Sequence, residues 1–211
     1  MSSPRYWSTA TRALASCDPV LARLVESHRA FQVGSRGDAF QTLARAIVGQ
    51  QISVKAAQSV WERFVAAVEV MSPVNVASVD CTRLRAAGLS ARKAEYVQDL
   101  ARRFHDGSIE PASWSDLADD AIIEQLVAVR GIGRWTAEMF LIFNLARPDI
   151  LPLADLGLQR ALCLNYNRGR PLAERRIRAI TGAWAPWRSV ATWYMWRSLE
   201  AVPVPQPVSR A

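Results

Sequence analysis

Helical periodicity runs through nearly the whole sequence. Apolar residues recur at three- and four-residue spacing, most clearly at 54–68, and no stretch alternates apolar and polar residues as a half-buried strand would. The runs also carry helix boundary signals, since Ser53 and Ser90 are placed to act as N-caps and Gly88 as a C-terminal stop. The sequence therefore predicts an all-α fold with about ten helices.

Caps, glycines and prolines set the expected helix boundaries. Asp18 and Asp38 precede apolar runs as N-caps, and the segments 71–75 and 146–154 contain prolines that break the pattern. No internal repeat or Gly- or Pro-rich linker divides the chain, so we expect one domain over 1–202 and a flexible Pro-rich tail at 203–211. The expected helices are 19–29, 39–48, 54–68, a short one before 88, 91–105, 119–129, 135–145, 155–164, 172–180 and 188–199.

The charge balance favours a polyanionic partner. Lysine and arginine number 26 against 19 acids, a net charge of +7. Only Lys55 and Lys93 are lysines, so almost no side-chain amine is available to act as a nucleophile. No apolar run reaches the ~20 residues of a membrane span, and the N-terminus lacks the apolar core of a signal peptide. We expect a cytoplasmic protein with no membrane partner.

The cysteines argue against a metal centre. Cys17, Cys81 and Cys163 lie far apart and form no C-x-x-C pair, so neither a zinc site nor an iron–sulfur cluster is expected. Three buried thiols are the expectation.

The segment LVAVRGIGRWTAEMFLIF, residues 126–143, carries the most information about function. Two expected helices flank the turn Gly131-Ile132-Gly133, whose glycines allow a tight reversal and keep side chains out of the way. The turn exposes backbone N–H groups at the positive end of the second helix, where a phosphate can bind. Arg134 and Thr136 could add side-chain contacts, and contacts of this kind position the protein without reading sequence.

A helical hairpin with a purely structural role in a core would have the same turn. The motifs that accompany this turn in the sequence favour a functional role instead. The pattern V-x-G-I-G-R-W-T-A-E-M is followed by L-P-x-x-D-L-G at 151–157, and AIVGQQISVKAA at 46–57 and the later WAPWRS accompany it. Together these segments resemble the helix-hairpin-helix (HhH-GPD) DNA glycosylase superfamily and, within it, the 3-methyladenine DNA glycosylase II family. The resemblance covers about residues 38–199.

The resemblance implies two helical lobes with an active-site cleft between them, lobe one at about 35–134 and lobe two from 1–34 plus 135–202. It also makes Asp155 the catalytic aspartate. Asp155 follows a loop and starts an expected helix, so it would also serve as an N-cap. Breaking the bond between base and sugar builds positive charge on the deoxyribose, which a fixed carboxylate stabilises while it orients or deprotonates the attacking water. A base alkylated at a ring nitrogen is already cationic and leaves without a strong general acid.

The resemblance further assigns a pocket for the flipped base. An indole face attracts a cationic base, and the pocket departs from the family pattern where Ala154 replaces a second acid that relatives often carry. Met139 and Leu156 stand where some relatives carry aromatic residues. The implied pocket residues are Trp135, Trp196, Gln50, Met139 and Leu156, with Trp187 nearby.

Three further expectations rest on the same resemblance. Gln51 would fill the gap left by the extruded base, and Gly131, Gly133, Arg134 and Thr136 would contact the DNA backbone. No cofactor is required, but relatives often bind sodium or potassium through hairpin carbonyls, which here match Val127, Val129 and Ile132. The expected partner is double-stranded DNA containing alkylated bases, bound by a monomer.

The sequence leaves three alternatives open. A bifunctional glycosylase with lyase activity would need a lysine amine, but Trp135 occupies the position that carries it in such enzymes. A non-catalytic DNA-binding module would need neither Asp155 nor the terminal aromatic run. A helical protein-interaction domain would need neither the positive charge nor the hairpin. We therefore expect a monofunctional DNA glycosylase.

Overall fold

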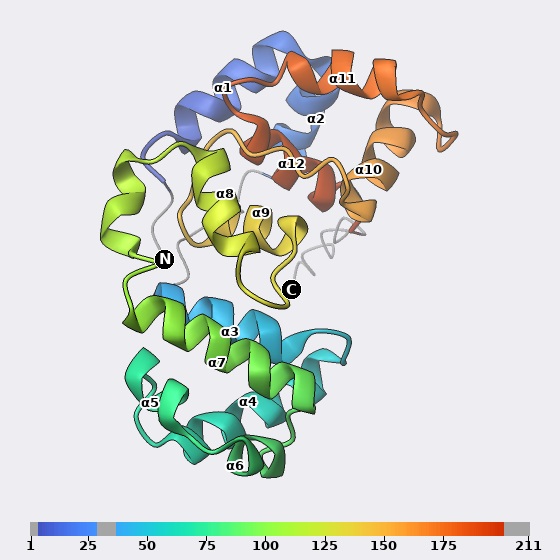
Figure 1. Ribbon diagram of the computed structural model, residues 1–211. Coiled ribbons are helices and arrows are strands. Elements are labelled where there is room, and N and C mark those ends of the chain that lie inside the picture. The colour runs from blue at the N-terminus through green and yellow to red at the C-terminus, as the bar shows by residue number, and fades with distance from the viewer. Residues whose placement is uncertain (1–3, 29–36, 201–211) are drawn as a thin grey trace, which may run out of the picture. The chain divides into compact units, whose positions relative to one another are not determined.

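The computed structural model describes residues 4–28 and 37–200, and every regular element within these ranges is a helix (Figure 1). This confirms the all-α prediction. No helix in this part of the chain is long and apolar enough to cross a membrane. The elements are α1 (Trp7–Cys17), α2 (Pro19–Ser27), α3 (Ala39–Gly49), α4 (Val54–Val68), α5 (Pro73–Ser78), α6 (Cys81–Ala86), α7 (Ala91–His105), the 3-10 helix η1 (Pro111–Asp116), α8 (Asp119–Val127), α9 (Arg134–Phe143), α10 (Leu156–Asn167), α11 (Glu174–Gly182) and α12 (Arg188–Arg197).

The chain divides into two compact units. The central unit lies within Ser35–Leu145, and the discontinuous unit lies within Met1–Gly34 and Ala146–Ala211. Sequence reasoning placed the boundary between residues 134 and 135, at the first turn of α9. The structure instead keeps all of α9 in the central unit, because this helix packs against α8 and α3.

The central unit is built around α3 and α7, which lie side by side in Figure 1 with α5 packed on α7. Caps predicted from the sequence set its helix starts: Asp38, Ser53 and Ser90 each accept a backbone N–H of the first turn. The core consists of apolar side chains from one face of each helix, including Phe40, Leu43, Ile47, Phe64, Val97, Leu100, Leu126 and Leu141.

The discontinuous unit is organised by α12, which contacts α1, α2 and α10. All seven residues from Ser189 to Met195 are buried, so α12 is covered on every side along most of its length. Asp18 caps α2, as expected, and also accepts hydrogen bonds from the Tyr166 hydroxyl at 2.6 Å and the Trp184 indole N–H at 3.3 Å. The Asp18 carboxylate therefore links α2 to α10 and to the turn before α12.

Several local expectations were wrong. Helix α1 was not foreseen, and Pro73 begins a helix where a break was expected, because Ser72 caps it. The cysteines were expected to be buried, but Cys17 and Cys81 are exposed and Cys163 is only partly buried. The tail 203–211 lies outside the described residues.

Candidate active site

Asp155 stands at the start of α10 in the discontinuous unit. Its Oδ1 accepts the backbone N–H of Leu158 at 2.6 Å, so the expected N-cap is present. The same oxygen accepts the indole N–H of Trp196, from the end of α12, at 2.8 Å. Two N–H donors therefore fix the orientation of a half-buried carboxylate, and one of them comes from a residue 41 positions further along the chain.

Gly157 leaves room for this approach. A Cβ at this position would lie 3.0 Å from Asp155 Oδ1 and 3.2 Å from Trp196 Cδ1. A side chain at residue 157 would therefore crowd this contact, and the indole and the carboxylate would have to shift by a few tenths of an ångström. Sequence reasoning missed this role, although the glycine stands in the L-P-x-x-D-L-G segment.

The loop before Asp155 is hydrogen-bonded to two helices, α12 and α10. Arg188 Nε and Nη2 donate to the two carboxylate oxygens of Asp149 at 2.7 Å each, a bidentate pair at the start of α12. The Ser189 hydroxyl accepts the backbone N–H of Ile150 at 2.8 Å, and Gln159 donates from α10 to the Leu153 carbonyl at 2.8 Å. These contacts hold the segment that delivers Asp155 to its position.

The other predicted pocket residues of this unit differ in their surroundings. Leu156 is 78% exposed, and Ala154 is exposed as well. Trp187 stacks on Tyr6 at 5.7 Å between ring centroids, which gives it a packing role between α1 and α12.

Burial raises the pKa of the Tyr6 hydroxyl to about 12, and this hydroxyl donates to the Ala146 carbonyl at 2.6 Å.

The hairpin turn lies in the central unit between α8 and α9. Gly131 has φ +82°, and a Cβ there would lie 2.2 Å from Tyr96 Cδ2 on α7, so only glycine fits. Gly133, the N-cap of α9, differs, because a Cβ there would meet nothing within 4 Å. The first turn of α9 receives no side-chain cap, because its N-cap residue, Gly133, has no side chain.

Gln50 is hydrogen-bonded to the hairpin turn at Gly131. Its Nε2 donates to the Gly131 carbonyl at 2.8 Å, a contact between residues 81 positions apart. Lys93 Nζ donates at 2.8 Å to the carbonyls of Val48 and Gln50 and so closes the end of α3. Burial lowers the pKa of Lys93. Gln51 is exposed and has φ +57°, a left-handed conformation at the junction of α3 and α4.

The side chains at the start of α9 are mostly exposed. Arg134 makes ion pairs with Asp120 and Glu138, each at 3.1 Å, and so links α9 to the start of α8. Trp135 is 49% exposed, while Thr136 and Met139 are half-buried. The structure therefore gives Arg134 two protein partners that the sequence did not indicate.

The expected cation site corresponds to three backbone positions, one at the end of α8 and two in the turn that follows. The Val129 carbonyl accepts the N–H of Ile132 at 3.1 Å, which helps to close the turn. Val127 ends α8 with an exposed side chain, whereas Val129 and Ile132 are buried. A sodium or potassium ion at these carbonyls stays a prediction.

Comparisons with known proteins agree on one family. Residues 44–186 match the HhH-GPD superfamily of base excision DNA repair proteins. A Bacillus subtilis relative, named provisionally as a DNA-3-methyladenine glycosylase, is 32% identical over 85% of this chain and 66% of its own length. This chain thus spans about two thirds of that relative.

Two solved structures are similar over nearly the whole chain. A DNA-3-methyladenine glycosidase from Bacillus halodurans has a TM-score of 0.85 and 32% identity, with 94% of this chain and 92% of that one covered. The Schizosaccharomyces pombe 3-methyladenine DNA glycosylase in complex with abasic DNA has a TM-score of 0.73 and 28% identity, with 93% and 99% covered.

Proposed function

Because this chain belongs to the HhH-GPD superfamily of base excision DNA repair proteins, as its motifs indicated, we propose that it is a monofunctional DNA glycosylase acting on alkylated bases such as 3-methyladenine. The names of its relatives support this substrate class. The observation that carries the proposal is the Asp155 carboxylate, held in one orientation by the Leu158 and Trp196 N–H groups. We expect a monomer that works in the cytoplasm on double-stranded DNA.

The proposed reaction is hydrolysis of the bond between base and sugar. As this bond breaks, its electron pair leaves with the base and positive charge develops on the deoxyribose. The Asp155 carboxylate stabilises that charge and accepts a proton from the attacking water, whose hydroxyl bonds to the sugar carbon. A base alkylated at a ring nitrogen carries a positive charge and leaves as a neutral molecule. The products are the free base and an abasic site.

The hairpin is proposed to hold the DNA backbone. The uncapped first turn of α9 offers N–H donors at the positive end of a helix dipole, and the open space at Gly133 lets a phosphate approach them. Since these donors belong to the main chain, the contact reads no sequence. The intercalating role of Gln51 and the pocket roles of Trp135, Met139 and Leu156 stay predictions of the family resemblance.

A direct assay tests the function. The protein is incubated with a duplex that carries one 3-methyladenine, and the products are separated to detect free base and abasic strand. Release of the free base supports the proposal. Tight binding without base release would favour the non-catalytic module instead.

The Trp196→Phe variant is expected to lower the single-turnover excision rate by about 10-fold, the equivalent of one hydrogen bond to a charged group. Phenylalanine keeps an aromatic ring but cannot donate to Asp155 Oδ1. Binding of an undamaged duplex should not change. The matched control is Trp184→Phe, which removes another indole–aspartate bond, to Asp18 at 3.3 Å. This control should lose stability but keep the excision rate of the folded protein; an equal rate for Trp196→Phe and wild type would contradict the positioning role.

The protein is expected to leave the abasic strand intact and to resist trapping on DNA by borohydride. Trapping requires an imine between an amine and the sugar aldehyde, but Lys93 Nζ is occupied by two carbonyls and Lys55 lies on α4. Nicks should appear on a denaturing gel only after alkali or heat. Efficient crosslinking that Lys55→Arg or Lys93→Arg abolishes would place the protein among the lyases, because arginine keeps the charge but forms no such imine.

A further inference from the structure

The positive charge of the chain is concentrated in one segment. Residues 156–182, which include α10, α11 and their connection, contain six arginines and a single acid, a net charge of +5 compared with +7 for the whole chain. The arginine frequency here is about twice the average of the chain. Neither the catalytic proposal nor the hairpin uses this charge.

The segment holds five exposed arginines that its single acid does not pair with. The only acid of the segment, Glu174, is paired with Arg178 at 2.6 Å. The remaining five are exposed and make no ion pair with another residue in the described part of the chain. We call them the arginine surface: Arg160, Arg168, Arg170, Arg175 and Arg176.

The backbone under the arginine surface is well fixed. The Asn167 side chain donates to the carbonyls of Arg170 and Pro171 at 3.0 and 2.8 Å, and the Gly169 N–H donates to the Cys163 carbonyl at 2.9 Å. On α11, Ile180 and Thr181 are buried and anchor the helix, so Arg175 and Arg176 lie on its exposed side. Binding a ligand here would therefore order only side chains, which limits its entropic cost.

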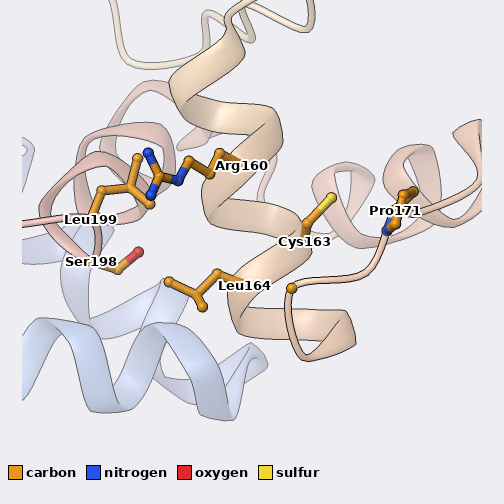
Figure 2. A pocket seen from close by; sticks show the side chains of 7 residues that line it. Arg160, Cys163, Leu164, Pro171, Ser198 and Leu199 are labelled. Carbon is orange, nitrogen blue, oxygen red and sulfur yellow. The ribbon is translucent and has the colours of Figure 1, made fainter.

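A pocket of about 400 Å³ lies beside this surface, lined by Arg160, Cys163, Leu164, Gly169, Pro171, Ser198 and Leu199. Figure 2 shows Arg160 pointing from α10 across the pocket towards Leu199, in the turn that follows α12. The pocket thus shares Arg160, Cys163, Leu164, Gly169 and Pro171 with the arginine-rich segment, so this face of the unit is hollowed beside the arginines.

We propose that the arginine surface is a second binding site for duplex DNA, which holds backbone phosphates through guanidinium groups and reads no sequence. The proposal rests on the proposed function, which brings the protein to DNA. Planar guanidinium groups match phosphate oxygens, and each neutralised phosphate releases counterions. An acidic protein partner fits less well, because α11 exposes no large apolar side chain that could anchor a protein interface: Ile180 is buried and Ile177 is half-buried.

The test is the salt dependence of binding to an undamaged synthetic duplex. The triple variant Arg170→Ser, Arg175→Ser, Arg176→Ser should bind at least about 10-fold more weakly at low salt. The slope of log K against log salt should become shallower by about two to three. Arg160 is left unchanged because it lies on the helix that Asp155 caps. Replacing the same three arginines with lysine should preserve most of the slope, because the charges remain.

The matched control removes the same charge elsewhere. Arg5, Arg12 and Arg85 are exposed, and their triple serine variant should keep a slope within about one of the wild type. Equal losses in both triple variants, or no loss in the first, would overturn the proposal. The excision rate at saturating enzyme should be the same in all variants; a rate that falls while binding is unchanged would also overturn it. Since binding is measured on undamaged DNA, this result stands even if the protein proves to excise no base.

Discussion

The Asp155→Asn variant is expected to bind DNA as the wild type does and to lose excision by about 100-fold or more. Asparagine is nearly isosteric, and its side-chain oxygen can still accept the N–H groups of Leu158 and Trp196. The cap of α10 and the orientation of the group are therefore preserved, while the negative charge that stabilises the developing sugar cation is lost. Single-turnover release of 3-methyladenine, measured beside the affinity for an undamaged duplex, separates the two effects.

A matched control for this variant is Asp38→Asn. Asp38 caps α3 as Asp155 caps α10, accepting the N–H of Gln41 at 2.7 Å, but it lies in the central unit. Both variants should lose a similar, small amount of stability in thermal melts. Only Asp155→Asn should lose excision. Near-normal turnover in Asp155→Asn would remove this residue from the catalytic role.

The Gly131→Ala variant is expected to lower the free energy of unfolding by about 2–4 kcal/mol. Alanine is strained at φ +82°, and its methyl group would overlap the Tyr96 ring, which would have to move. The hairpin would then shift away from α7 or the ring would lose its packing. Urea unfolding followed by circular dichroism measures the loss, which should be accompanied by weaker DNA binding.

Two comparisons make this prediction specific. In the double variant Gly131→Ala, Tyr96→Ala the overlap is gone, so the combined loss should be smaller than the sum of the single losses. Gly133→Ala should lose at most about 1 kcal/mol of stability, because its Cβ meets only open space and alanine is only a poorer N-cap, and yet it should bind DNA more weakly. A wild-type affinity in Gly133→Ala would argue against backbone contact there. Full stability in Gly131→Ala would contradict the steric argument.

Helix positions followed from the sequence where the signals were local. The predicted ranges 54–68 and 91–105 are the observed bounds of α4 and α7, because Ser53 and Ser90 each cap the helix through an N–H three residues away. Helix α1 has no side-chain cap and packs through Trp7, Ala10 and Leu14, so nothing local marked its start. The resemblance to a glycosylase family likewise rested on short, continuous sequence motifs, and the family comparison confirms it.

The sequence by itself determined the helical fold, the cap at Asp155 and the glycine turn at 131–133, since each depends on residues within a few positions of one another. Only the tertiary structure decided that Trp196 donates to Asp155, that Gln50 holds Gly131, and that Tyr96 excludes any side chain at that glycine. These contacts join residues tens of positions apart. Helical periodicity states which face of a helix is buried, but not which side chain of another helix it will meet there.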